Sequence, residues 1–247
     1  MKPNALILRA PGTNCNNETA YAFEQAGAKT EQIHINRLLE SPALLKDFQI
    51  LCFPGGFSYG DDIASGRILA NQIKHHLKDA VRCFREAKKL ILGICNGFQV
   101  MIRSGILFAD DEQGAAATLN WNDSGMFHDS WTRLNVVSDK CVFLRGIRSM
   151  YLPVAHAEGK FMTRNQEILD LFEKQGQLVL KYEPADNPNG AMAHTAGVCD
   201  ETGLVFGLMP HPERHIAPTQ HPRWTRGEAS DTGDGLAVFR NAVTYFT

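Results

Sequence analysis

The sequence predicts an α/β fold, in which a mostly parallel, open β-sheet is covered by helices on both faces and carries a small antiparallel extension. Two observations lead to this prediction. Over the first hundred residues, short apolar runs alternate with stretches of helical periodicity, as in chains that build parallel sheets. Over residues 121–161 the pattern changes to short runs of alternating polarity, which favour antiparallel strands. No linker separates two halves, so we expect a single domain over residues 1–247.

The first hundred residues alternate between strands and helices. Residues 18–26 have helical character and stop at Gly27, a typical C-cap. Residues 67–88 carry the longest amphipathic pattern. The expected order is strand 5–8, helix 18–26, strand 30–35, strand 50–53, helix 67–88, strand 90–94 and a helix that opens over 98–102.

The second half begins with the antiparallel part and then returns to the first style. Strands that alternate with helices imply right-handed crossovers and a parallel sheet. Ligands of such a sheet bind beyond the carboxyl ends of the strands. The expected elements are strands 131–137 and 151–155, helix 166–174, strands 178–181 and 204–209, and a closing helix 235–245.

The composition is that of an ordinary globular protein with a sizeable core: 247 residues, 44% hydrophobic and 21% charged. There are 25 basic and 27 acidic residues, a formal net charge of −2, so the chain lacks the basic footprint of a nucleic-acid-binding protein. No apolar stretch approaches the roughly 20 residues of a membrane span. The opening residues lack the apolar core of a signal peptide. We therefore expect a cytoplasmic protein.

The six cysteines are scattered and form no C-x-x-C pair, which predicts reduced thiols. Cys52 lies inside an apolar strand and is expected in the core. Cys15 lies on a loop at the edge of the sheet where the parallel strands end, but no glycine stands two residues before or after it, so we expect it to be structural. Cys95 differs from the other five.

Cys95 stands between a buried strand and a helix, in the pattern Gly93-x-Cys95-x-Gly97. A sharp strand-to-helix turn needs neighbours without a Cβ, as in a nucleophile elbow. The helix N-terminus would favour a thiolate, and the amide of Asn96 is placed to bind an oxyanion. A buried cysteine in a tight turn is the alternative interpretation.

A thiol nucleophile requires a base and a group that orients the base. The strand predicted at 204–209 runs into His211, Pro212 and Glu213. Pro212 favours extended backbone at His211, so the side chains of His211 and Glu213 project to one side. The alternatives are an ordinary surface loop, or a metal site of His211, Glu213 and His215. The metal site is disfavoured because Pro212 opposes the helix that an H-E-x-x-H motif needs.

Several motifs together resemble the class I glutamine amidotransferases, which have a flavodoxin-like fold. Within that family they are most similar to the glutaminase subunits of phosphoribosylformylglycinamidine synthases. The resemblance reaches to about Arg214. It rests on PGTNC at 11–15, PGGFSYGDD at 54–62, GICNGFQ at 93–99, PVAHAEGKF at 153–161, NPNGAMAHTAGV at 187–198 and MPHPER at 209–214.

The resemblance implies that Cys95 attacks the side-chain amide of glutamine. His211 would act as base and then as acid, and Glu213 would orient it. Ammonia leaves, and the glutamyl thioester on Cys95 is hydrolysed to glutamate. The amides of Gly56 and Asn96 would form the oxyanion hole. The remaining residues implied in substrate or oxyanion binding are Gly55, Phe57, Gln99 and His156.

The resemblance also implies a partner. Ammonia passes to a synthetase subunit, which binds ATP and Mg²⁺, and the sequence leaves open whether a small accessory subunit joins them. No cofactor or metal is expected in this chain, which has no G-x-x-x-x-G-K-[ST] loop. No nucleic acid or membrane is expected as a partner.

The polar residues beside the motifs, and one departure from the family pattern, give further expectations. His156 and Glu158 are interpreted as shaping the glutamine pocket, and Asp61 and Asp62 as a solvated face. Ala157 stands where the family more often has glycine, a mild change.

The segment between Arg214 and the last helix is long. Its Trp224, flanked by Arg223 and Arg226, is interpreted either as a docking point for the synthetase or as a solvated loop.

Three alternatives remain at this point. The chain is a glutaminase for another synthetase, or a stand-alone hydrolase such as a γ-glutamyl peptidase, or a non-catalytic binding module on the same fold. The partner that stimulates the chain separates the first alternative from the leading hypothesis, and the preferred substrate separates the second. An intact Cys95, His211 and Glu213 argues against the third.

Overall fold

A computed structural model describes residues 2–228 and 230–247, so Met1 and Ala229 lie outside the described residues. A nine-stranded sheet, in the order β2-β1-β3-β4-β11-β10-β9-β6-β7, forms its centre. The strands of this sheet are β1 (Asn4–Arg9), β2 (Lys29–His34), β3 (Ile50–Phe53), β4 (Leu90–Ile94), β6 (His128–Val136), β7 (Ser149–His156), β9 (Leu180–Tyr182), β10 (Thr195–Cys199) and β11 (Val205–Leu208).

The five strands from β2 to β11 pair in parallel, and the strands from β10 to β7 pair antiparallel. A separate antiparallel pair joins β5 (Ala117–Asn120) to β8 (Lys160–Thr163). The mostly parallel sheet is therefore confirmed. The antiparallel extension is larger than the two strands predicted, because β9 and β10 belong to it as well.

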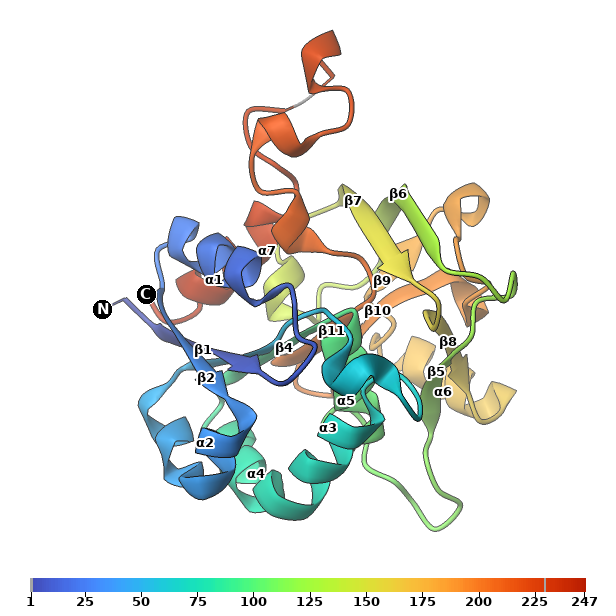
Figure 1. Cartoon of the computed structure of the whole chain (residues 1–247). Helices are drawn as coiled ribbons and strands as arrows, with labels where there is room; N and C mark the ends of the chain where they lie inside the picture. Colours follow the sequence, from blue (N-terminus) through green and yellow to red (C-terminus); the bar gives the residue numbers. More distant parts are fainter. Residues whose placement is uncertain (1, 229) are drawn as a thin grey trace.

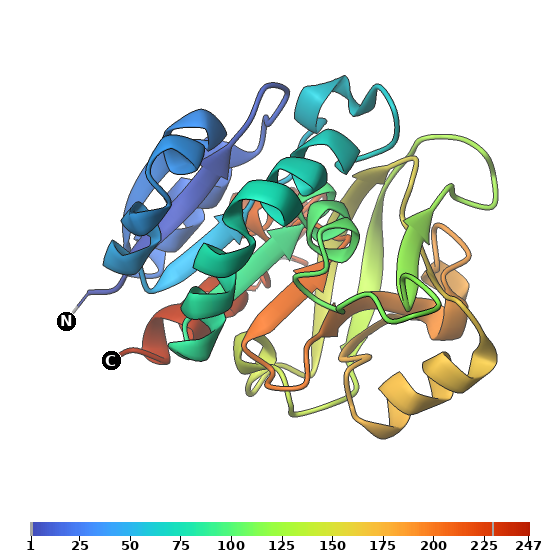
Figure 2. The same ribbon diagram turned by 90° about the horizontal axis from the view of Figure 1, so that it is seen from below.

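Helices cover both faces of the parallel half. Helices α1 (Asn16–Gln25) and α7 (Leu236–Thr244) pack together on one face (Figure 1). Helices α3 (Arg67–Gln72), α4 (Lys78–Glu86) and α5 (Asn96–Arg103) lie across the other face, seen in Figure 2. Two shorter helices are α2 (Ile35–Glu40) and α6 (Gln166–Lys174).

The predicted helix 67–88 is interrupted in the structure. A π-helical turn at Ile73–Leu77 separates α3 from α4. The helical path continues through this turn, and the side chains of Ile73 and Leu77 stay buried. None of the described helices is long and apolar enough to span a membrane.

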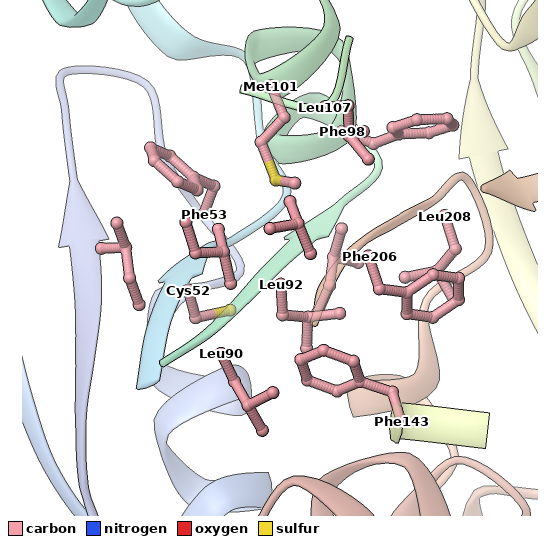
Figure 3. Packing of buried hydrophobic residues seen from close by; sticks show 14 of the residues in the cluster. Cys52, Phe53, Leu90, Leu92, Phe98, Met101, Leu107, Phe143, Phe206 and Leu208 are labelled. Carbon is pink, nitrogen blue, oxygen red and sulfur yellow. The ribbon is translucent and has the colours of Figure 1, made fainter. Parts of the chain in front are cut away.

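The core explains why the central strands read as unbroken apolar runs. Every residue of β3 and β4 is buried, because helices cover both faces of these strands. Figure 3 shows the side chains of Phe98 and Met101, from α5, on one face of β4, and Leu92 with Phe206 on the other. Cys52 lies beside Leu92 with no exposed surface, so its predicted core position is confirmed.

Candidate active site

Four parallel strands end at the same edge of the sheet, and the loop that follows each strand contributes residues to one site. β1 leads to the loop that holds Cys15, β3 leads to Gly55, β4 leads to Cys95 and β11 leads to His211. The site therefore lies beyond the carboxyl ends of the parallel strands, where this architecture places ligands. Residues 196 positions apart meet here, as the ion pair of Glu18 with Arg214 shows.

The backbone of Cys95 is strained. Its φ is 49° and its ψ is −106°, outside the regions that non-glycine residues favour. Such a conformation costs on the order of 1–3 kcal/mol and persists only where the surroundings enforce it. Here the Cys95 amide donates to the Leu208 carbonyl at 2.8 Å, which ties the turn to β11. The predicted elbow between strand and helix is present.

The two glycines around Cys95 are required by close packing. A Cβ on Gly97 would strike the Phe53 carbonyl at the end of β3, and one on Gly93 would strike Met101 and the backbone of Gly97. The first turn of α5 therefore lies directly against the sheet. This contact fixes the position of the Cys95 side chain, which is 5% exposed.

His211 and Glu213 form a buried pair. Nδ1 of His211 lies 2.6 Å from Oε1 of Glu213, and the backbone N–H of His211 donates to the Pro153 carbonyl at 2.8 Å. The side chains project together, as the spacing around Pro212 predicted. Among the described residues, Nε2 of His211 has no hydrogen-bond partner, so it is free for the reaction.

The charges around His211 favour its protonated form. Burial lowers the pKa of the imidazole, but the carboxylate of Glu213 and, after it, the neighbouring Cys95 raise this pKa by more than burial lowers it. The net result is a His211 pKa well above its ordinary value. The sulfur also lies 3.7 Å from the Ala155 carbonyl oxygen. Cys95 therefore shares its pocket with the imidazole and with the end of β7, instead of lying among aliphatic side chains alone.

Two backbone amides near Cys95 are unused by the fold. Neither Gly56 nor Asn96 donates a backbone hydrogen bond to any described residue. The amide of Phe57, by contrast, donates to the Gly12 carbonyl at 2.9 Å, and the Gly55 carbonyl accepts from Cys15 at 3.2 Å. Of the residues predicted for oxyanion binding, Gly56 and Asn96 thus have free donors, whereas Gly55 and Phe57 hold the loop.

A polar network supports the first turn of α5. The Asn96 side chain donates to Asp61 at 3.1 Å and to Gln99 at 3.0 Å, and Gln99 donates to the Glu158 carbonyl at 2.6 Å. The Glu158 carboxylate pairs with Arg103 at 3.2 Å. This network links the loop after β3, the helix α5 and the turn after β7.

Sequence reasoning missed two members of that network. Asp61 is not a solvated carboxylate, because it also accepts from the backbone N–H of Gly66 at 3.1 Å, and burial raises its pKa. Asp62 is exposed, as expected. Arg103 was not singled out. A signal was present, since Asn96, Gln99 and Arg103 recur at helical spacing on an otherwise apolar helix.

His156 is buried beside the site. Its Nδ1 lies 3.2 Å from Oδ1 of Asn122, and among the described residues its Nε2 has no partner. Burial, with smaller effects from His211 and His128, lowers the pKa of His156 to about 3. The ring is therefore neutral at physiological pH and offers one unused nitrogen.

The neutral state of His156 makes the fold sensitive to acid. In the unfolded chain its pKa is about 6.5, so between pH 6.5 and about 3 the unfolded state binds the proton and the folded state does not. Stability should fall with decreasing pH through this window, by up to about 1.4 kcal/mol per pH unit from this group. Urea unfolding of wild type and His156→Gln at several pH values measures the difference.

The control for this prediction is His76→Gln, at an exposed position on the π turn. We expect the stability of this control to follow that of the wild type at every pH. If the free energies of unfolding of wild type and His156→Gln changed equally with pH, His156 would not be the buried neutral group.

Cys15 packs on the imidazole of His211. A Cβ on Gly55 would contact both the Cys15 sulfur and the His211 ring, so these two groups lie next to each other. Nη2 of Arg214 donates to the Cys15 sulfur at 3.1 Å. Burial is the largest influence on the thiol and raises its pKa to about 11, so Cys15 is a protonated neighbour of the site.

The structure does not assemble the metal set considered from the sequence. Nδ1 of His215 lies 2.8 Å from the Tyr151 carbonyl and is used there. The ligand atoms of Cys15, His211 and Glu213 do lie within 4.8 Å of one another. A cation among them would have to displace the proton between His211 and Glu213, and it would face the guanidinium of Arg214.

Residues 216–228 and 230–234 belong to an arm that projects from the body (Figure 1). Near its base, His221 packs 6.1 Å from Trp131 and 5.6 Å from Tyr151, between ring centroids. Trp224 is 51% exposed. Its neighbour Arg223 pairs with Glu228 at 3.5 Å. The docking segment considered from the sequence includes Ala229, which is outside the described residues, and docking through Trp224 stays a prediction.

Comparisons with known proteins agree on one family. A model of the CobB/CobQ-like glutamine amidotransferase domain matches residues 2–246. The chain is 48% identical to "Phosphoribosylformylglycinamidine synthase subunit PurQ" of Dehalococcoides mccartyi, over 99% of this chain and 98% of that protein. It is 40% identical to the same subunit of Methanococcus maripaludis, over 99% and 97%. A chain in "Structure of PurLQS from Thermotoga maritima" matches at TM-score 0.78 and 30% identity, with full coverage of both chains.

Proposed function

The chain belongs to the CobB/CobQ-like glutamine amidotransferase domain family, and from that premise we propose that it is the glutaminase subunit of a phosphoribosylformylglycinamidine synthase. It hydrolyses glutamine to glutamate and ammonia, and it passes the ammonia to a synthetase subunit in purine biosynthesis. One observation carries the chemistry: a cysteine held at a strained turn shares a pocket with a buried imidazole–carboxylate pair.

The first half of the reaction uses the charges described above. The Cys95 sulfur attacks the side-chain carbonyl carbon of glutamine and forms a tetrahedral adduct. The free amides of Gly56 and Asn96 stabilise its oxyanion. Protonated His211 donates its proton to the leaving nitrogen, the C–N bond breaks, and ammonia leaves. The product is a glutamyl thioester on Cys95.

The second half returns the site to its starting state. His211, now neutral, takes a proton from water, and the resulting hydroxide adds to the thioester carbon. The C–S bond breaks, and glutamate leaves. Glu213 accepts a hydrogen bond from Nδ1 throughout, so Nε2 faces the reaction in both halves.

Glutamine recognition is assigned to the walls of this pocket. The unused Nε2 of His156 is available to a ligand. Gln99 is placed one helical turn beyond Cys95, and its amide is already engaged by Asn96 and by the Glu158 carbonyl. We therefore assign Gln99 to the pocket wall, where it holds the Asn96 amide in place. The ATP-dependent step, with its Mg²⁺, is assigned to the synthetase.

Glutamine turnover with and without the partner tests this function. We expect the isolated chain to hydrolyse glutamine slowly, and we expect the synthetase of phosphoribosylformylglycinamidine synthase to accelerate hydrolysis. Ammonia release is measured with glutamine, with a γ-glutamyl peptide, and with an unrelated ammonia-dependent synthetase as the control partner. Fast turnover of the peptide without a partner would favour a stand-alone hydrolase. If only the unrelated synthetase accelerated glutamine hydrolysis, the chain would belong to another pathway.

A further inference from the structure

Cys15 is a buried thiol beside the candidate active site, and the reaction proposed above does not use it. It lies on the loop after β1, directly before α1, and is 1% exposed. This loop is bound to the loop after β3, because the Cys15 amide donates to the Gly55 carbonyl at 3.2 Å and Thr13 forms a β-bridge with Gly56. The backbone around Cys15 is therefore fixed against the loop that carries the free amide of Gly56.

The Cys15 sulfur lies against the pair of His211 and Glu213. A Cβ on Gly55 would come within 3.0 Å of the sulfur and within 2.8 Å of Cε1 of His211, so little space separates the sulfur from the ring. The sulfur, a ring nitrogen of His211 and a carboxylate oxygen of Glu213 all lie within 4.8 Å of one another. The thiol therefore occupies space next to both members of the pair.

Two hydrogen bonds fix the position of the thiol. It donates to Oδ1 of Asn14 at 3.1 Å, and it accepts from Nη2 of Arg214 at 3.1 Å. Nε of Arg214 donates to Glu18 at 2.9 Å. The guanidinium is thus held by Cys15 and Glu18, although Arg214 directly follows Glu213 in the chain.

One carboxylate oxygen of Glu213 is left without a partner. Oε1 lies 2.6 Å from Nδ1 of His211, whereas Oε2 is buried and has no hydrogen-bond partner among the described residues. A buried carboxylate oxygen without a donor costs free energy, so its isolation requires an explanation. A water molecule or a guanidinium bound to Oε2 would take up part of the negative charge. While Oε2 is unbound, that charge acts on His211.

We propose that Cys15 is a positioning residue of the glutaminase, an inference that rests on the proposed function. Its thiol fills space beside Glu213 and binds the guanidinium of Arg214, so that neither water nor the guanidinium reaches Oε2. The carboxylate then holds the His211 ring in place and keeps it protonated for the transfer to the leaving nitrogen. Without the sulfur, a space lined by polar groups would open beside the pair, and such a space admits water.

The groups around His211 give the sign of the expected pH effect. Burial lowers the pKa of His211, whereas Glu213 and Cys95, and after them Cys15, raise it. Loss of the thiol should therefore lower this pKa and move the alkaline limb of the kcat profile to lower pH. The other titratable or charged groups near the pair are Cys52 on β3, His156 at the end of β7, and the ion pair of Arg214 with Glu18.

Two variants at position 15 test the proposal in the complex with the synthetase. Cys15→Ala removes the sulfur, and Cys15→Ser replaces it with a hydroxyl that can make the same two hydrogen bonds. We expect Cys15→Ala to lower kcat for glutamine hydrolysis at least about tenfold, to move the alkaline limb to lower pH, and to keep KM within about twofold. We expect Cys15→Ser to keep kcat within about threefold and the limb in place.

Cys141→Ala is the matched control, because it removes an equally buried thiol outside the site. Cys141 lies beside Cys199, which pairs with Phe206 near the start of β11, whereas His211 follows the end of that strand. We expect this control to keep kcat and the alkaline limb. Ammonia-dependent synthesis, measured in parallel, should be unchanged in all three variants.

The remaining outcomes would overturn the proposal. An unchanged kcat and limb in Cys15→Ala would show that His211 does not depend on the thiol. Failure of Cys15→Ala to fold, or a joint loss of glutamine-dependent and ammonia-dependent synthesis, would assign Cys15 to the fold alone. A Cys15→Ser variant as impaired as Cys15→Ala would exclude the two hydrogen bonds as the cause. If the wild-type complex does not hydrolyse glutamine, the proposed function fails instead.

Discussion

Replacing Cys95 by alanine should lower glutamine-dependent synthesis by about 10³-fold or more while leaving ammonia-dependent synthesis by the complex intact. The substitution removes the atom that forms the thioester, and no other described side chain occupies the same turn. Supplied ammonia does not need that atom, because the synthetase consumes ammonia directly. Initial rates with saturating glutamine, and separately with an ammonium salt, measure the two activities.

The variant also keeps the fold, which makes the result interpretable. Alanine has the same Cβ as cysteine, so the close packing of Gly93 and Gly97 around the turn is undisturbed. The sulfur itself contributes little apolar burial compared with the leucines and phenylalanines of the core. Urea unfolding should therefore show a change of only about 1 kcal/mol.

Cys83→Ala is the matched control, because Cys83 is an exposed thiol on α4. We expect it to retain both activities. A glutamine-like electrophile should label the wild type and Cys83→Ala, but not Cys95→Ala. Loss of both activities in Cys95→Ala would mean that Cys95 is structural, and labelling of another cysteine would move the nucleophile.

The parallel half of the fold was predictable because its signals are local. Strands β3 and β4 are covered on both faces, so each appears in the sequence as an unbroken apolar run. The elbow at Cys95 follows from the same packing, since a Cβ at Gly97 would strike the end of β3. His211 and Glu213 were found because Pro212 restricts the backbone between them.

The antiparallel half was harder to predict because its strands are defined by their partners. β10 is buried at every residue but has the sequence TAGVC, in which small residues give no alternation. It exists because β11 and β9 flank it. The role of Asp61 was missed for the same reason. A carboxylate on a glycine-rich loop looks solvated in sequence, and only the fold brings it to the Asn96 side chain.

Replacing Glu213 by glutamine should lower kcat for glutamine hydrolysis by about 10³-fold and should also change its pH dependence. Burial lowers the pKa of His211, and the Glu213 carboxylate is the largest of the influences that raise it. Without that charge the imidazole loses its proton at lower pH. Protonated His211 is the group that donates to the leaving ammonia, so activity falls as pH rises through the pKa of His211. The alkaline limb of the kcat profile should therefore move to lower pH in the variant.

Glu18→Gln separates this effect from a general loss of negative charge at the same edge of the sheet. Glu18 pairs with Arg214 at 2.9 Å and does not contact His211, so we expect its variant to keep kcat within about threefold and to keep the alkaline limb in place. In Glu213→Gln the new side chain would still fit beside His211, but its amide offers no charge and permits the wrong tautomer of the ring. If kcat of Glu213→Gln were lower at every pH but its alkaline limb did not move, the carboxylate would only orient the imidazole. In that case the stabilisation of the imidazolium would have to come from Cys95 and Cys15.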